Sequence, residues 1–162
     1  MKPGLRHHRP SAPGDPAPLE QTLVRTIHFH EVDPMGVMWF GNYCRLLDEA
    51  SAHLRAKCGM AYEDFKKAGV MAPVKRMEMD YQRPLLLGEE VRITVRMPWN
   101  EALRIDTECV IYKPDGRIAA TGWMVQLLVD AVDMSPIYIE LPFIRQIRER
   151  WRGGEFSECQ PT

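Results

Sequence analysis

The sequence has no long hydrophobic run, no close pair of cysteines and no marked excess of charge of either sign. No apolar stretch approaches the roughly 20 residues that span a bilayer, and the N-terminus has no hydrophobic segment typical of a secretory signal. The four cysteines are scattered without a CxxC pair, which indicates free thiols in a reducing compartment and argues against a disulfide framework or a zinc site. These absences predict a cytoplasmic protein without a membrane partner.

Charge and composition are those of an ordinary globular protein. Lysine and arginine number 21 against 22 aspartates and glutamates, so the net charge is −1 and no nucleic-acid partner is expected. Hydrophobic residues make up 45% and charged residues 27% of the 162 residues, which suits one domain with a sizeable core.

The chain divides into three parts by composition. Residues 1–20 are rich in proline and offer little to bury, so we predict a disordered N-terminal tail. A single domain is expected over residues 21–152, with ordered structure starting near Leu23. Residues 153–162 begin with two glycines and are expected to be a flexible C-terminal tail.

Periodicity and turn signals predict the elements of the domain. A strand, a long helix and a short helix are expected first, then further strands and a charged terminal helix. A hairpin turn is predicted at Lys113-Pro114-Asp115-Gly116. The expected ranges are 23–32 for the first strand, 42–57 and 61–68 for the helices, 70–82, 91–97, 103–112 and 117–129 for strands, and 142–151 for the last helix.

This order predicts an α+β fold in which a curled antiparallel sheet wraps around a long central helix. Such a sheet leaves edge strands open, and pairing two edges is one way to protect them. We therefore expect a homodimer or homotetramer.

The segment EVDPMGVMWFGNYCRLLDEA, residues 31–50, is the most informative part of the chain. Asp33 opens a turn with Pro34, and Gly36 can adopt the positive φ that such a turn often needs. A carboxylate beside a helix N-terminus can do chemistry, because the unpaired amides there can bind developing negative charge. Asp33 is equally compatible with a cap or turn role, and Gly36 with a turn role alone.

Residues 33–51, DPMGVMWFGNYCRLLDEAS, resemble the signature of the 4-hydroxybenzoyl-CoA thioesterase family: an Asp, a Gly three residues on, an aromatic pair and Asn-Tyr. The resemblance extends over residues 24–132 and includes VKRMEMDYQRPLLLGEEVRI and the hairpin at Asp115-Gly116. It implies the hotdog fold and hydrolysis of an acyl-CoA thioester, with coenzyme A as part of the substrate and no cofactor or metal.

The resemblance also implies roles for individual residues. Asp33 would be the catalytic carboxylate, as nucleophile or as general base for water. The backbone N–H of Phe40, with Gly41 adjacent, would polarise the thioester carbonyl. A bacterial subgroup of the family has His at the position of Phe40, so a mechanism that needs that imidazole does not apply here. The pair Trp39-Phe40 is more similar to aromatic-acyl hydrolases, which favours an aromatic or medium-chain acyl group.

The remaining members of the motif have two interpretations each. Gly36, Trp39, Asn42 and Tyr43 could line the substrate site, whereas Asn42 could instead cap the helix and Tyr43 pack in the core.

Charged residues and histidines outside this motif are also ambiguous. The cations Lys75, Arg76 and Arg83 could meet the phosphates of coenzyme A or simply face solvent. Asp48 and Glu49 could supply a second acid or be solvated or paired. His28 and His30 are expected on one face of the first strand without a third metal ligand.

Three other functions remain possible from the sequence. The first is a thioesterase acting on an acyl-carrier protein. The second is a non-catalytic acyl-CoA-binding hotdog module, against which the intact Asp33 motif argues. The third is a hotdog dehydratase, which would need a His that the motif lacks.

Overall fold

The computed structural model describes residues 12–161. One five-stranded antiparallel sheet, in the order β1-β4-β5-β6-β3, accompanies a separate pair of short strands, β2 and β7. The elements are β1 (Leu19–Thr26), η1 (Phe29–Glu31), α1 (Asn42–Lys57), α2 (Tyr62–Lys67), β2 (Val70–Met71), β3 (Val74–Tyr81), β4 (Glu90–Met97), β5 (Arg104–Tyr112), β6 (Ile118–Leu127), β7 (Val129–Asp130), α3 (Pro142–Arg152) and η2 (Ser157–Cys159).

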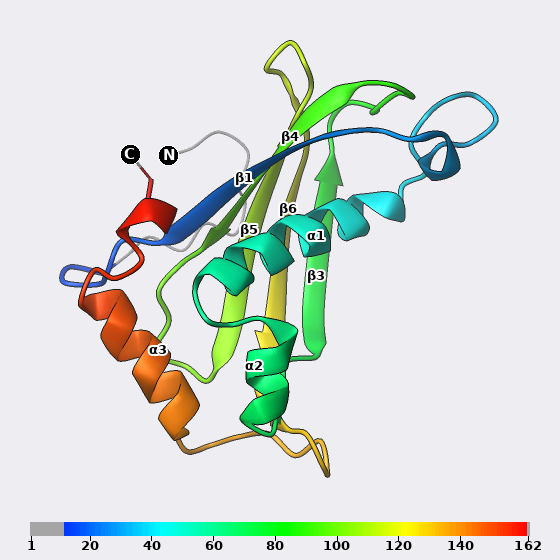
Figure 1. The fold of residues 1–162 in the computed structure, drawn as a ribbon. Coiled ribbons are helices and arrows are strands. Elements are labelled where there is room, and N and C mark those ends of the chain that lie inside the picture. The colour runs from blue at the N-terminus through cyan, green and yellow to red at the C-terminus, as the bar shows by residue number, and fades with distance from the viewer. Residues whose placement is uncertain (1–11, 162) are drawn as a thin grey trace.

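The long helix α1 lies across one face of the sheet, and α2 follows it near the lower ends of the strands (Figure 1). The alternation of apolar and polar side chains along β4 explains why the sheet packs against α1. Val91, Ile93 and Val95 are fully buried, while Arg92 between them is exposed. Each such side chain stabilises the fold by roughly 1.5–3 kcal/mol. The matching stripe on α1 consists of buried residues at helical spacing: Leu46, Leu47, Ala50 and Leu54.

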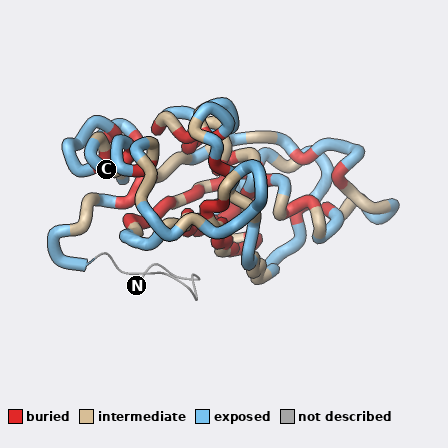
Figure 2. Tube along the Cα trace, turned by 90° about the horizontal axis from the view of Figure 1, so that it is seen from below, coloured by how far each residue is buried: buried red, intermediate tan, exposed pale blue. Residues whose placement is uncertain are grey.

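The central helix has the predicted bounds. It ends at Lys57 with Cys58 as its C-cap, and Gly59 follows with φ +68°, a left-handed conformation that glycine adopts without a steric penalty. Buried stretches gather in the middle of the molecule, whereas exposed stretches form its periphery (Figure 2). The α+β prediction, with its curled sheet around one long helix, is confirmed.

Two predicted strands differ from the structure. The first spans Leu19–Thr26 rather than 23–32, so it overlaps the predicted tail 1–20 by two residues; residues 1–11 of that tail lie outside the described residues. The predicted strand 70–82 is two strands, β2 and β3. Ala72-Pro73 separates them, since proline cannot donate to a ladder.

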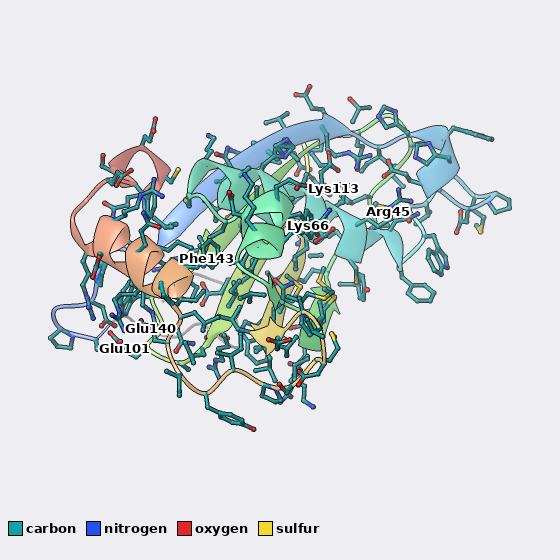
Figure 3. The ribbon with its side chains drawn as sticks, turned by 60° about the horizontal axis from the view of Figure 1, so that its bottom comes forward. Arg45, Lys66, Glu101, Lys113, Glu140 and Phe143 are labelled. Carbon is teal, nitrogen blue, oxygen red and sulfur yellow. The ribbon has the colours of Figure 1, made fainter. Side chains whose placement is uncertain are left out.

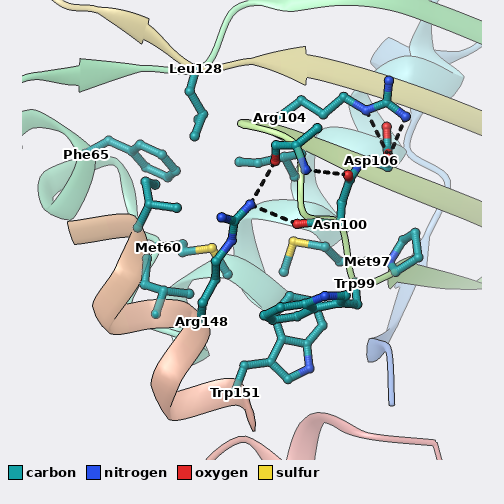
Figure 4. A pocket seen from close by; sticks show the side chains of 15 residues that line it. Met60, Phe65, Met97, Trp99, Asn100, Arg104, Asp106, Leu128, Arg148 and Trp151 are labelled. Atoms are coloured by element: carbon teal, nitrogen blue, oxygen red, sulfur yellow. Dashed lines mark hydrogen bonds and ion pairs between the residues drawn. The ribbon is translucent and has the colours of Figure 1, made fainter. Parts of the chain in front are cut away.

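The C-terminal part packs against the domain. Arg148 of α3 donates to the carbonyl oxygens of Asn100 and Ala102, at 2.9 and 3.0 Å. Figure 4 shows Arg148 reaching toward Asn100. Trp151 and Trp99 meet edge to face with centroids 5.1 Å apart. Beyond α3, Phe156 and Cys159 are only 4% and 3% exposed. Two side chains of the segment 153–162, predicted to be a flexible C-terminal tail, are thus buried against the domain.

Among residues 12–161, no helix has both the length and the apolar character that a membrane crossing requires.

Candidate active site

Residues 27–41, which we call the site loop, connect β1 to α1 through a tight reversal of the chain. Val32 and Met38 form an antiparallel bridge across it, and Val37 bridges to Leu86 on the far side. The loop is thus held both internally and by the segment that follows β3. A carboxylate placed at its tip has a fixed position relative to the helix start.

Asp33 lies at that tip and is half-buried. Its Oδ1 accepts hydrogen bonds from the amides of Met35 and Val37, at 2.9 and 3.1 Å. Gly36 donates to the Asp33 carbonyl at 2.9 Å and has φ +75°, as the turn prediction required. From residues 12–161, Oδ2 receives no hydrogen bond. The structure therefore gives Asp33 a turn role through one oxygen and leaves the other available to a substrate or water.

A buried carboxylate two residues before Asp33 fixes the loop, and the sequence analysis missed it. Glu31 is 2% exposed, and its Oε2 accepts from Arg25 Nη2 at 2.5 Å and from the His28 amide at 2.8 Å. Arg25 also donates to Glu49 of α1 at 2.8 Å. Burial alone would raise the pKa of Glu31, but the His28 amide and the Arg25 guanidinium together hold that pKa below its usual value.

The backbone of Glu31 joins the loop to the start of α1. Its carbonyl oxygen accepts from the Trp39 amide and from Asn42 Nδ2, each at 2.9 Å. Asn42 is 8% exposed and is the first residue of α1, while Gly41 is the N-cap and makes no side-chain cap. The capping interpretation of Asn42 is therefore wrong, because its amide crosses to the loop instead of closing the helix.

The amides of Phe40 and Gly41 are open. Within the described part of the chain, neither N–H donates a hydrogen bond. A Cβ on Gly41 would come within 2.1 Å of the Trp39 ring, so only glycine fits there with the ring in its present position. Two unpartnered amides at the start of a helix can stabilise an oxyanion.

Aromatic side chains surround this helix start. Trp39 and Phe40 lie with centroids 4.9 Å apart and are 53% and 64% exposed. Tyr81, at the end of β3, donates to the Phe40 carbonyl at 3.2 Å, and its ring meets Tyr43 edge to face at 5.0 Å. Tyr43 is 3% exposed, accepts from the Leu85 amide, and burial raises the pKa of its phenol. Tyr43 thus belongs to the core, whereas Trp39 and Phe40 form an open apolar surface.

The three predicted phosphate-binding cations lie at two ends of β3. Lys75 and Arg76 are near its start, where Arg76 pairs with Glu78 and covers the Trp123 ring. Arg83 follows its end, near Tyr81, and donates to the Ile118 carbonyl at 2.9 Å. At roughly 3.3 Å per residue, the strand holds Lys75 and Arg83 more than about 20 Å apart. One chain cannot bring them to a single phosphate.

The other candidates have simpler surroundings. His28 and His30 stack at 5.8 Å beyond the end of β1, so the expectation that they lie on a strand is wrong. Among residues 12–161 no cluster of three or more His, Cys, Asp or Glu side chains could hold a metal ion. Glu49 pairs with Arg25, and Asp48 is largely exposed, 3.6 Å from Arg55.

The profile of the thioesterase-like superfamily matches residues 27–139, and the chain belongs to that family. It has the hotdog fold and is a thioester hydrolase by class. The site loop, the central helix and every strand of the sheet except β1 fall within the matched region.

The individual relatives share only a modest part of their sequence with this chain. The chain is similar to the 1,4-dihydroxy-2-naphthoyl-CoA hydrolase of Thermosynechococcus vestitus, with 27% identity over 63% of this chain and 70% of that protein. Its fold is similar to a DHNA-CoA thioesterase from Staphylococcus aureus (TM-score 0.74, 22% identity, 88% of this chain and 97% of that one). It is also similar to a hypothetical protein from Staphylococcus aureus solved in complex with CoA (TM-score 0.73, 15% identity, 89% of each chain).

Proposed function

We propose that this protein is an acyl-CoA thioesterase that releases an aromatic or medium-chain acid and coenzyme A, without a cofactor. The observation that carries the proposal is the juxtaposition, in one short loop, of an open Asp33 oxygen and the two unpartnered amides at the start of α1. Relatives named for CoA thioesters support the CoA part of the substrate.

The chemistry follows from these groups. The thioester oxygen would bind at the Phe40 amide, with Gly41 adjacent, so that charge developing on it is stabilised at the helix start. Asp33 Oδ2 would either attack the carbonyl carbon or remove a proton from an attacking water. In both routes the C–S bond breaks, coenzyme A leaves as the thiol, and one water is consumed to form the carboxylic acid.

The aromatic surface beside the open amides favours an aromatic or medium-chain acyl group. Trp39 and Phe40 expose apolar rings next to the open amides, where an aryl or alkyl group attached to the bound carbonyl would contact them. Two of the relatives above are named as hydrolases of a naphthoyl-CoA and of DHNA-CoA, and the naphthoyl name is consistent with this preference.

A second copy of the chain would complete the CoA site. Strand β3 is an edge of the sheet, with exposed Val74 and Tyr81 at its ends. Antiparallel pairing of β3 with the same strand of a second copy would bring the Lys75 end of one chain beside the Arg83 end of the other. Cations that one chain keeps apart would then meet one phosphate group, and the proposed homodimer or homotetramer follows.

The experiment is a hydrolysis screen of the purified protein over CoA esters with aromatic, short, medium and long acyl groups. The preferred acyl group is then tested again on an acyl-carrier protein. Higher kcat/KM for aromatic or medium-chain CoA esters is the expected result. Faster turnover of the carrier-protein ester would show that the substrate is an acyl-carrier-protein thioester and not an acyl-CoA. Binding of all esters without turnover would indicate a non-catalytic module.

A further inference from the structure

A cavity lies at the other end of α1 from the site loop. It has a volume of about 430 Å³, within the range of small-molecule sites, and opens between the end of α1, helix α2 and strand β2. Asn42 and Arg55 are 13 residues apart on the helix, so this cavity lies about 20 Å from the helix start. Its walls are mainly apolar and include Met60, Phe65, Val70 and Ala72.

Arg55 is the unusual member of that lining. It is only 6% exposed, yet its nearest carboxylate is Asp48, 3.6 Å away and 57% exposed on the surface of the same helix. Among residues 12–161 its guanidinium donates one hydrogen bond, from Nη1 to Gln126 Oε1 at 2.8 Å. A buried guanidinium with five N–H donors normally has a close anionic partner. Arg55 therefore has donors left for a ligand.

The neighbours of Arg55 hold its guanidinium in place and leave the lining with a net positive charge. Gln126 Nε2 donates to the Ala72 carbonyl at 2.6 Å, which turns the amide oxygen toward Arg55. The ring of Tyr62 covers the guanidinium at 5.7 Å. Lys66, which Figure 3 shows on α2, adds a second positive charge to the lining, against the single negative charge of Glu63.

We infer that this cavity binds an apolar monocarboxylate, with its carboxylate on Arg55 and its hydrocarbon body against Phe65 and Val70. The cation is nine-tenths buried in an apolar cavity, and the carboxylate is the planar anion that matches a guanidinium fork. The inference does not depend on catalysis at Asp33. A free acid of the kind that thioester hydrolysis releases belongs to the ligand class that this site fits.

Calorimetric titration of the full chain with octanoate and with octanamide, its uncharged analogue, tests the inference. Octanoate is expected to bind at least about tenfold more tightly, because only it forms a charge-assisted hydrogen bond with Arg55. Equal affinities, or no binding of octanoate, would overturn the proposal. Asp33→Asn must bind octanoate like the wild type, and a changed affinity in that variant would place the ligand at the site loop instead, because the Asp33 charge acts on a carboxylate only at short range.

Two variants locate the ligand. Arg55→Gln should remove the preference for octanoate, whereas Arg45→Gln, an exposed arginine on the same helix outside this cavity, should keep it (Figure 3). Ala131→Trp at the exposed rim should block binding of both ligands while Arg55 stays in place. If Arg55→Gln does not fold, Ala131→Trp alone tests the location of the ligand. Unchanged octanoate binding in Ala131→Trp refutes the proposed site.

Discussion

Two aromatic pairs in this molecule have nearly the same centroid separation and opposite surroundings. Trp39 and Phe40 lie 4.9 Å apart at the helix start and are more than half exposed, whereas Trp99 and Trp151 lie 5.1 Å apart and are 4% and 6% exposed. The buried pair joins α3 to the sheet and contributes to the free energy of unfolding. The open pair contributes little to it and lies beside unpartnered amides, which is how a binding surface differs from a core.

The largest expected effect on stability is at the buried pair. Trp151→Ala should lower the free energy of unfolding by about 3–5 kcal/mol, because it removes the ring that packs on Trp99 and the hydrogen bond from Nε1 to the Ala17 carbonyl. Urea denaturation measures the loss. A change under about 1 kcal/mol would show that α3 is not held by this pair.

The next effect concerns Glu31, the buried carboxylate of the site loop. Glu31→Gln should cost about 1–3 kcal/mol, since it leaves the Arg25 guanidinium and the His28 amide without an ionised acceptor. Because the pKa of Glu31 is lowered by folding, its stabilising effect is present above the unfolded-state pKa and is lost as the pH falls through the folded-state pKa. The wild type should therefore lose stability in acid more steeply than Glu31→Gln.

Denaturation midpoints between pH 3 and 7 check this prediction. Glu49→Gln is the matched control, because Glu49 binds the same arginine but its side chain is 42% exposed. An equal acid dependence in Glu31→Gln and in the wild type would contradict the role given to Glu31.

The open pair should respond in binding instead of stability. Trp39→Ala is expected to raise KM for an aromatic CoA ester about five- to tenfold and to change the free energy of unfolding by no more than about 0.5 kcal/mol. Steady-state kinetics with an aromatic and a short-chain ester separate ring contact from a general loss. If both esters are affected alike, the ring does not contact the acyl group.

The smallest effect is expected at Gly41. Its αR backbone accepts alanine, which is a slightly poorer N-cap than glycine, and the new Cβ requires the Trp39 ring to swing away. Gly41→Ala should therefore fold normally, shift the Trp39 fluorescence and weaken aromatic selectivity. Unchanged fluorescence would show that the ring does not lie over Gly41 in solution.

The elements with local signals could be predicted from the sequence. The helix over residues 42–57 has an apolar stripe and a glycine after its end, and the hairpin at Asp115-Gly116 has its own turn residues. The start of β1 could not be predicted, because its register with β4, from Leu19 opposite Met97, is a long-range pairing. The packing of Phe156 against Arg150 likewise depends on contacts that local composition does not encode.

In the candidate site, too, only the features with local sequence signals could be predicted. The Asp33 turn, Gly36 and the helix start followed from residue types and spacing. Glu31 could not be found that way, because its importance arises only where Arg25 from β1 and the His28 amide converge on it. The cavity around Arg55 was equally invisible, since a charged residue in an amphipathic helix is normally on the solvent side.

The central claim is that Asp33 supplies the reacting carboxylate, and one comparison tests it most directly. Turnover of the preferred CoA ester is measured for Asp33→Asn and for Asp48→Asn, which changes an exposed acid on α1, together with thermal unfolding of both. We predict a loss of about 10²–10⁴-fold for Asp33→Asn alone, with both variants folded. Turnover near the wild-type rate in folded Asp33→Asn would contradict the claim.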